Sequence, residues 1–152
     1  MFSAVKATWL LNTYDPKRAR ARAGELVMGT VDSWVAWNLT GSCTTDIGNA
    51  SRMSLLDIET GQWSAELLEI FDVPRECLPF IGPSMRSDVA ITNGQLAGRP
   101  LGALVGDSHA ALFSHKGWKP GTTKVTVGTG SSVMTTAPQV VGDSGLCRTI
   151  SW

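Results

Sequence analysis

The stretch LGALVGDSHAALFSHKGWKPGTTKVTVGTG, Leu101–Gly130, decides how this chain is interpreted. Its apolar start, Leu101–Val105, predicts a buried strand, and Ser108–His115 predicts a short helix soon after it. Asp107 lies where the predicted strand gives way to the predicted helix. The sequence therefore places one carboxylate at a strand-to-helix turn.

A glycine-framed turn follows this carboxylate. The β-branched runs Thr122–Val127 and Ser131–Thr136 flank Gly128-Thr129-Gly130, so they predict a hairpin whose tip has bare backbone amides that can face an anion. A carboxylate that accepts a proton, close to an anion cradle, suits transfer of a phosphoryl group to a hydroxyl. The structural alternatives are an Asp107 that only caps a helix and a hairpin tip that is a plain turn.

The rest of the chain mixes helices and strands. Lys6–Tyr14 predicts a helix with Trp9 and Leu10 on its buried side, and Val31–Leu39 predicts another after a Thr30 cap. Ser64 is expected to cap a third helix, and Gly145–Trp152 to form a last strand. This mixture indicates an α/β or α+β class.

Composition excludes several classes of function. The 13 basic and 13 acidic side chains balance, so nothing points to nucleic acid or to an anionic membrane. Cys43, Cys77 and Cys147 are odd in number and widely spaced, which argues against a disulfide framework or a zinc site and favours the cytoplasm. No apolar run approaches the ~18 residues of a membrane span. His109 and His115 lie six apart on one short helix and cannot chelate one metal together.

Eight blocks in register resemble the FGGY carbohydrate kinases, most closely the glycerol-kinase branch. They are Met1–Asn12 with Lys6 three residues before Trp9, GTVDSW at Gly29–Trp34, TDIGNASR at Thr45–Arg52, Trp63 with ELL at Glu66–Leu68, GDSHAALF at Gly106–Phe113, KPG at Lys119–Gly121, GTG at Gly128–Gly130, and GLCRTISW at Gly145–Trp152. Each block alone is weak evidence, but their order and spacing hold over nearly the whole chain.

The resemblance implies an α/β fold of the ribonuclease H-like (actin-like ATPase) type, present incompletely. On that model residues 1–118 are the later part of the family's N-terminal domain, and residues 119–152 are the opening strands of its C-terminal domain. ATP and substrate would bind in the cleft between the two domains.

The resemblance also implies roles for the central stretch. Asp107 falls on the family's catalytic aspartate, which accepts the proton of the substrate hydroxyl, and it would help to hold Mg²⁺ through water. Gly128, Thr129 and Gly130 fall on a phosphate loop that contacts the γ-phosphate of ATP. A helix N-terminus stabilises a negative charge, so capping and catalysis by Asp107 are compatible.

The substrate positions depart from the glycerol branch. Ile47 stands where that branch carries a Tyr, and Ser132 where it carries a Phe. His109, in a Ser-His pair that replaces Gln-Gln, is expected either to hydrogen-bond a larger substrate or to be an ordinary helix-surface histidine. These differences predict a sugar or polyol other than glycerol as the small-molecule partner, and a homo-oligomer is left open.

Two functions from different classes follow. The first is an ATP-dependent carbohydrate kinase, present here as a fragment that is inactive alone. The alternative is a non-catalytic truncated remnant or binding module that keeps only the scaffold. Phosphorylation of a sugar by the complete protein would distinguish the two.

Overall fold

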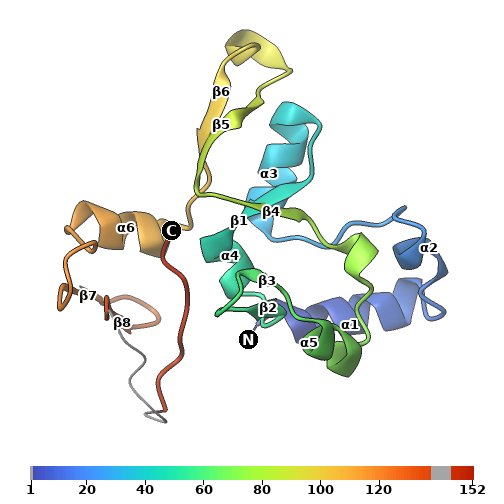
Figure 1. Ribbon diagram of the computed structural model, residues 1–152, viewed down its shortest axis with the longest axis horizontal. Helices are drawn as coiled ribbons and strands as arrows, with labels where there is room; N and C mark the ends of the chain where they lie inside the picture. The colour runs from blue at the N-terminus through green and yellow to red at the C-terminus, as the bar shows by residue number, and fades with distance from the viewer. Residues whose placement is uncertain (1, 138–144) are drawn as a thin grey trace. The chain divides into compact units, whose positions relative to one another are not determined.

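The structure, a computed structural model, describes residues 2–137 and 145–152. The chain divides into two compact units, which are labelled by element in Figure 1. The first unit comprises the residues up to Val105 together with Thr149–Trp152, and the second comprises Gly106–Arg148. None of the helices in the described ranges is long and apolar enough to cross a membrane.

Short helices and paired strands build the first unit. Its helices are α1 (Ser3–Tyr14), α2 (Ala19–Arg22), α3 (Val31–Thr40), α4 (Ile47–Ser51) and α5 (Ala65–Phe71), with 3-10 turns at Arg75–Cys77 and Gly94–Leu96. Its strands are β1 (Thr44–Asp46), β2 (Leu56–Asp57), β3 (Gln62–Trp63), β4 (Phe80–Gly82), β5 (Met85–Ala90) and β6 (Pro100–Ala103). Strands β1 and β4 pair in parallel, whereas β2–β3 and β5–β6 are antiparallel pairs.

Helix α1 forms where the sequence predicts a helix, but it buries a different face. Ala4, Ala7 and Leu11 are buried, and they follow the three- and four-residue spacing of one helical face. Trp9 and Leu10, which were expected to be buried, are exposed. Small alanines allow close packing, and the Ala4 N–H donates to the Met53 carbonyl at 2.9 Å. Figure 1 shows α1 beside α5, which it contacts.

In helix α3 too, small residues are buried and large apolar side chains are exposed. Its buried residues are Ser33, Ala36 and Thr40, while Val31 and Trp34 are exposed. Gly41 ends the helix in the left-handed region, at φ +74°, and its N–H bonds the Trp37 carbonyl. The predicted helix is therefore confirmed, and its two large apolar side chains Val31 and Trp34 lie on the exposed side.

The core of the first unit joins α1 to the segment around β2 and β3. Its buried members are Ala4, Ala7, Leu11, Ala21, Ala50, Met53, Leu55, Leu56, Trp63, Val73, Cys77 and Leu78. The Ser64 side chain accepts the Leu67 N–H at 3.3 Å, so the predicted cap of α5 is confirmed. The strand predicted over residues 145–152 is wrong, because no strand forms there; instead Ile150 packs against the core and its N–H donates to Ser51 Oγ at 3.1 Å.

A buried carboxylate organises the turn before α2. Asp15 Oδ2 accepts the Ala21 N–H at 2.9 Å, and only 6% of Asp15 is exposed. This hydrogen bond is the first reason that the pKa of Asp15 lies below its ordinary value; burial opposes the shift, and the Arg20 and Ala19 N–H groups add to it. A depressed folded-state pKa stabilises the fold above the unfolded-state value, about 3.9, and this stabilisation is lost as pH falls through the folded-state pKa.

We therefore expect Asp15→Asn to destabilise the chain at neutral pH and to approach the stability of the wild type as pH falls through the depressed folded-state pKa of Asp15. At low pH the protonated Asp15 carboxyl and the substituted amide are both neutral, which removes the difference between the two proteins. Urea unfolding midpoints measured from pH 2 to pH 7 provide the test. A destabilisation that stays the same over this whole pH range would show that Asp15 acts without its charge.

The second unit contains a helix and a hairpin. Helix α6 (Asp107–Ser114) is followed by β7 (Thr123–Thr126) and β8 (Ser132–Thr135), which pair antiparallel with Thr126 opposite Ser132. The Gly121 N–H donates to the Thr136 carbonyl at 3.0 Å and closes the base of the hairpin. The predicted helix and hairpin are confirmed. Leu101–Val105 is less buried than predicted, since only Leu104 of that run is buried.

Candidate active site

Asp107 is the first residue of α6. Gly106 is the N-cap, so the expectation that Asp107 itself caps the helix is wrong by one position. Asp107 Oδ1 accepts the Ser108 N–H at 2.6 Å, and the side chain is exposed. The positive end of the helix dipole favours a negative charge there. Asp107 is thus a solvent-accessible carboxylate, oriented by a backbone amide and able to accept a proton.

The glycine tip joins β7 to β8 in the same compact unit as Asp107. Gly128, Thr129 and Gly130 are all exposed, and α6 packs against β7. A Cβ added at Gly130 would meet no atom within 4 Å, and one at Gly128 would meet only the Gly130 carbonyl oxygen, at 3.7 Å. The backbone at this tip is therefore open to close approach by an anion.

His109 and Ser132 belong to this unit as well. His109 is buried on α6, so its interpretation as an ordinary helix-surface histidine is wrong. Ser132 is the first residue of β8 and is exposed. Of the residues that sequence reasoning assigns to the site, the second unit thus contains every one except Ile47.

Ile47 follows the carboxyl end of β1 and begins α4. In the β1–β4 ladder Asp46, the last residue of β1, lies opposite Gly82, the last residue of β4. Ile47 therefore directly follows the edge at which these two parallel strands end. Open α/β sheets bind ligands at this kind of edge. The Ile47 side chain packs against the core, and a Cβ at Gly61 would lie 3.1 Å from its Cδ1 atom.

The sequence analysis did not identify Asp46 as a functional residue. At this edge its buried carboxylate accepts hydrogen bonds at both oxygens. Its Oδ1 accepts the Asn49 N–H at 2.8 Å and Asn49 Nδ2 at 2.7 Å, and its Oδ2 accepts the Gly48 N–H at 3.2 Å and the Ser84 hydroxyl at 2.6 Å. Asp46 caps α4 and is fully buried. An Asp directly before a short helix was the available sequence signal.

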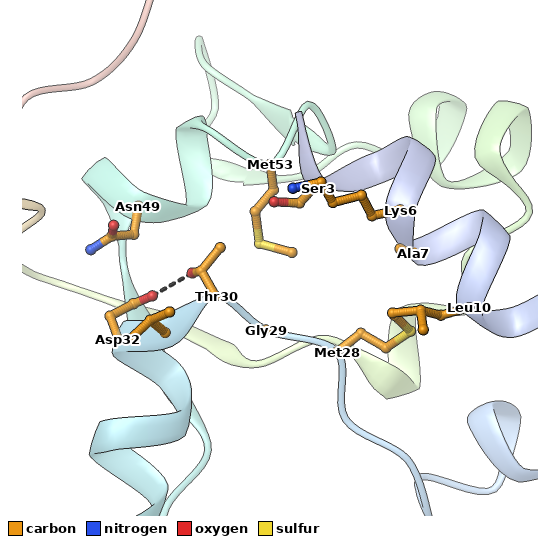
Figure 2. Close-up of a pocket in the computed structure, with 11 residues that line it drawn as sticks. Ser3, Lys6, Ala7, Leu10, Met28, Gly29, Thr30, Asp32, Asn49 and Met53 are labelled. Carbon is orange, nitrogen blue, oxygen red and sulfur yellow. Dashed lines mark hydrogen bonds between the residues drawn. The ribbon is translucent and has the colours of Figure 1, made fainter. Parts of the chain in front are cut away.

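A cavity of about 460 Å³ lies in the first unit, and Figure 2 shows it. It is lined by Ser3, Lys6, Ala7, Leu10, Met28, Gly29, Thr30, Val31, Asp32, Asn49 and Met53. The two oxygens of Asp32 accept the Thr30 hydroxyl and, at 2.6 Å, the Thr45 hydroxyl, so Asp32 ties the start of α3 to β1. Asp32 therefore has a structural role in the first unit. None of the predicted site residues lines the cavity.

Among the described residues of the second unit, a divalent metal would find one carboxylate, that of Asp107, rather than a cage. Among the described residues, no group of three or more His, Cys, Asp or Glu side chains is placed to hold a metal. Mg²⁺ commonly keeps several waters and binds through one or two carboxylates together with substrate phosphates. The exposed Asp107 carboxylate fits that mode of binding.

A match between this sequence and the model of a protein family shows to which family the chain belongs. The model of the N-terminal domain of the FGGY family of carbohydrate kinases matches residues 1–114. This chain belongs to the FGGY family. The resemblance inferred from the eight sequence blocks is therefore confirmed.

Relatives and solved structures agree with this assignment. This chain is 42% identical to a glycerol kinase of Corynebacterium efficiens. The alignment is 160 residues long and covers 97% of this chain and 32% of the relative. A crystal structure of Plasmodium falciparum glycerol kinase with ADP matches with a TM-score of 0.79 and 30% identity, over 87% of this chain and 27% of that one. The xylulose kinase of Rhodospirillum rubrum matches in fold, with a TM-score of 0.74 at 18% identity over 90% of this chain and 29% of that one.

Two statements follow from these matches. The fold is a partial ribonuclease H-like (actin-like ATPase) fold of mixed helices and strands, as predicted. The chain spans about a third of the length of the glycerol kinase of C. efficiens that it matches.

Proposed function

We propose that this chain is part of an enzyme that transfers the γ-phosphoryl group of ATP to a hydroxyl of a sugar or polyol. Membership of the FGGY family supports this reaction class. The observation that carries the proposal is that an exposed helix-start carboxylate and an exposed glycine tip occur in one compact unit. These two features suit phosphoryl transfer, because that reaction depends mainly on positioning of the reactants and on stabilisation of charge.

In this proposal Asp107 is the general base. Its carboxylate accepts the proton of the attacking hydroxyl, and the Ser108 N–H holds one of its oxygens in place. Backbone amides of Gly128, Thr129 and Gly130, with the Thr129 hydroxyl, bind the γ-phosphate. ATP would bring Mg²⁺, which neutralises phosphate charge, and Asp107 would hold a water of that ion.

The acceptor is proposed to be a sugar or polyol other than glycerol. Ile47 and Ser132 replace the aromatic side chains of the glycerol branch, which changes the apolar contact offered to a carbon backbone. His109 is proposed to hydrogen-bond an additional hydroxyl.

The chain alone is proposed to be inactive. It spans about a third of the glycerol kinase that it matches, and we place the boundary between the two family domains at residues 118 and 119. The second candidate is a non-catalytic remnant or binding module that keeps the scaffold without the reaction.

A chimera separates the two candidates. We would replace the aligned segment of the C. efficiens glycerol kinase with this chain, and then measure ADP formation from ATP against a panel of polyols and ketoses. The kinase proposal predicts phosphorylation by the chimera of at least one acceptor other than glycerol, and none by the chain alone. A folded chimera that binds ATP and phosphorylates no acceptor would favour the remnant.

A further inference from the structure

Lys124 lies on the covered face of the hairpin in the second unit. It is 9% exposed, whereas Val125 is 62% exposed and Val127 85%. Side chains along a strand alternate between its two faces, so β7 places a cationic side chain on the covered side and apolar ones in solvent. This reverses the usual arrangement, because lysine is almost never buried unless it is paired.

The Lys124 ammonium has no partner in the part of the chain that the structure describes. It makes neither a hydrogen bond nor an ion pair there, and its nitrogen is not among the side-chain atoms that are shut off from solvent. The stem of Lys124 is therefore buried while the charged end stays accessible. An anion that reached this cation would offset the cost of holding a charge in a largely buried place.

The charges around Lys124 favour an anion as its ligand. Among the described residues of the second unit, Asp107 is the one carboxylate side chain, while the cationic side chains are those of Lys116, Lys119, Lys124 and Arg148. An excess of one sign of charge raises the local concentration of ligands that carry the opposite sign. The unit therefore suits a ligand with several negative charges.

The position of Lys124 along β7 indicates which part of such a ligand it contacts. Gly128, the first residue of the glycine tip, comes four residues after Lys124. Strand residues rise about 3.3 Å each, so the two positions lie up to about 13 Å apart. A single phosphate group cannot bridge this distance, whereas a lysine side chain and a chain of linked phosphates together can.

We propose that Lys124 binds the phosphates of ATP that are not transferred. This inference rests on the proposed function, because it takes the terminal phosphate to lie at Gly128–Gly130. Lysine binds phosphate as a point charge, and its hydrogen bonds to an anion are stronger than those between neutral groups. Because these phosphates are present in both ATP and ADP, Lys124 contributes to nucleotide affinity rather than to the transition state.

The first test uses the 152-residue chain and inorganic tripolyphosphate, since Lys124 and the glycine tip belong to one compact unit. Calorimetry at low ionic strength, where charges are least screened, should show binding to the wild type. Lys124→Met keeps a stem of similar length and removes the charge, so it should weaken binding by about tenfold or more. Lys124→Arg keeps the charge and should retain most of the affinity.

Lys119→Met is the matched control, because it removes the same charge from an exposed position in the same unit. It should leave the affinity for tripolyphosphate nearly unchanged. Circular dichroism of each variant checks that the fold is retained. The proposal is overturned if the wild-type chain does not bind tripolyphosphate, or if the Lys119→Met and Lys124→Met substitutions weaken binding equally.

The second test uses the chimera with the C. efficiens glycerol kinase. Lys124→Met should raise the KM for ATP by about tenfold while kcat and the KM for the acceptor stay the same, because loss of uniform binding raises KM alone. Calorimetry should show weaker binding of ADP and unchanged binding of adenosine, which has no phosphates. A role of Lys124 in packing alone would not separate these two ligands.

This inference and the proposed function fail on different results. A folded chimera that phosphorylates no acceptor, yet loses ADP affinity in the Lys124→Met variant, would contradict the proposed function and support the role of Lys124. A chimera that turns over with the same KM for ATP before and after Lys124→Met would overturn the role of Lys124 and leave the proposed function intact.

Discussion

Asp107→Asn in the kinase chimera is expected to lower kcat on the order of a thousandfold, within the range of general acid–base contributions. Asn has nearly the same shape as Asp, and its side-chain oxygen can still accept the Ser108 N–H that orients the carboxylate at 2.6 Å. What the substitution removes is the ability to take a proton from the attacking hydroxyl. Because Asp107 is exposed at the first turn of α6, the fold should tolerate the change.

The two kinetic constants distinguish a base from a binding residue. Loss of a group that acts in the transition state lowers kcat and kcat/KM together, whereas loss of uniform binding raises KM alone. Steady-state kinetics of ADP formation, with sugar affinity measured separately by calorimetry, should therefore show a large fall in kcat and nearly unchanged sugar binding.

Glu69→Gln is the matched control, since it removes one carboxylate from the exposed surface of α5. This variant should retain the full kcat of the chimera. An Asp107→Asn enzyme that turns over at the rate of the Glu69→Gln enzyme would end the assignment of Asp107 as the base.

Asp46→Ala is expected to give the largest loss of stability in the first unit, about 3–5 kcal/mol. The Asp46 carboxylate is fully buried and accepts four hydrogen bonds, which come from Gly48, from the backbone and side chain of Asn49, and from Ser84. Removing it leaves these donors without a partner in a buried place and removes the cap of α4. Each of these losses adds to the cost.

Ser64→Ala provides the scale for a cap alone. Ser64 accepts a single N–H, that of Leu67, so its loss should cost about 1 kcal/mol. Urea unfolding followed by circular dichroism gives both free energies of unfolding. Equal effects of the two substitutions would mean that Asp46 serves only as a helix cap.

Elements with strong local signals could be predicted from the sequence. The hairpin around Gly128-Thr129-Gly130 follows from β-branched runs on either side of glycines. Helix α5 begins after Ser64 because a serine side chain can satisfy a free N–H at the helix start. These features depend on residues close together in the chain.

Burial could not be predicted in the same way. Trp9 and Trp34 are large and apolar, yet both are exposed, while Ala4, Ala36 and His109 are buried. Which side of a helix is covered depends on where other segments lie, and the sequence of that helix alone does not contain this information. The expected final strand failed for a related reason, because Ile150 packs against the core and bonds Ser51 instead of pairing with a strand.

The sequence by itself determined the family, the mixed helix and strand class, and the order of Asp107 and the glycine tip along the chain, because each depends on residue types at fixed spacing. Only the tertiary structure decided that the Asp46 carboxylate is buried and hydrogen-bonded and that His109 is buried. It also decided that the indoles of α3 line a hollow on the surface. These features arise where segments distant in the sequence meet, and hydrogen bonds and burial exist only once those segments are in place.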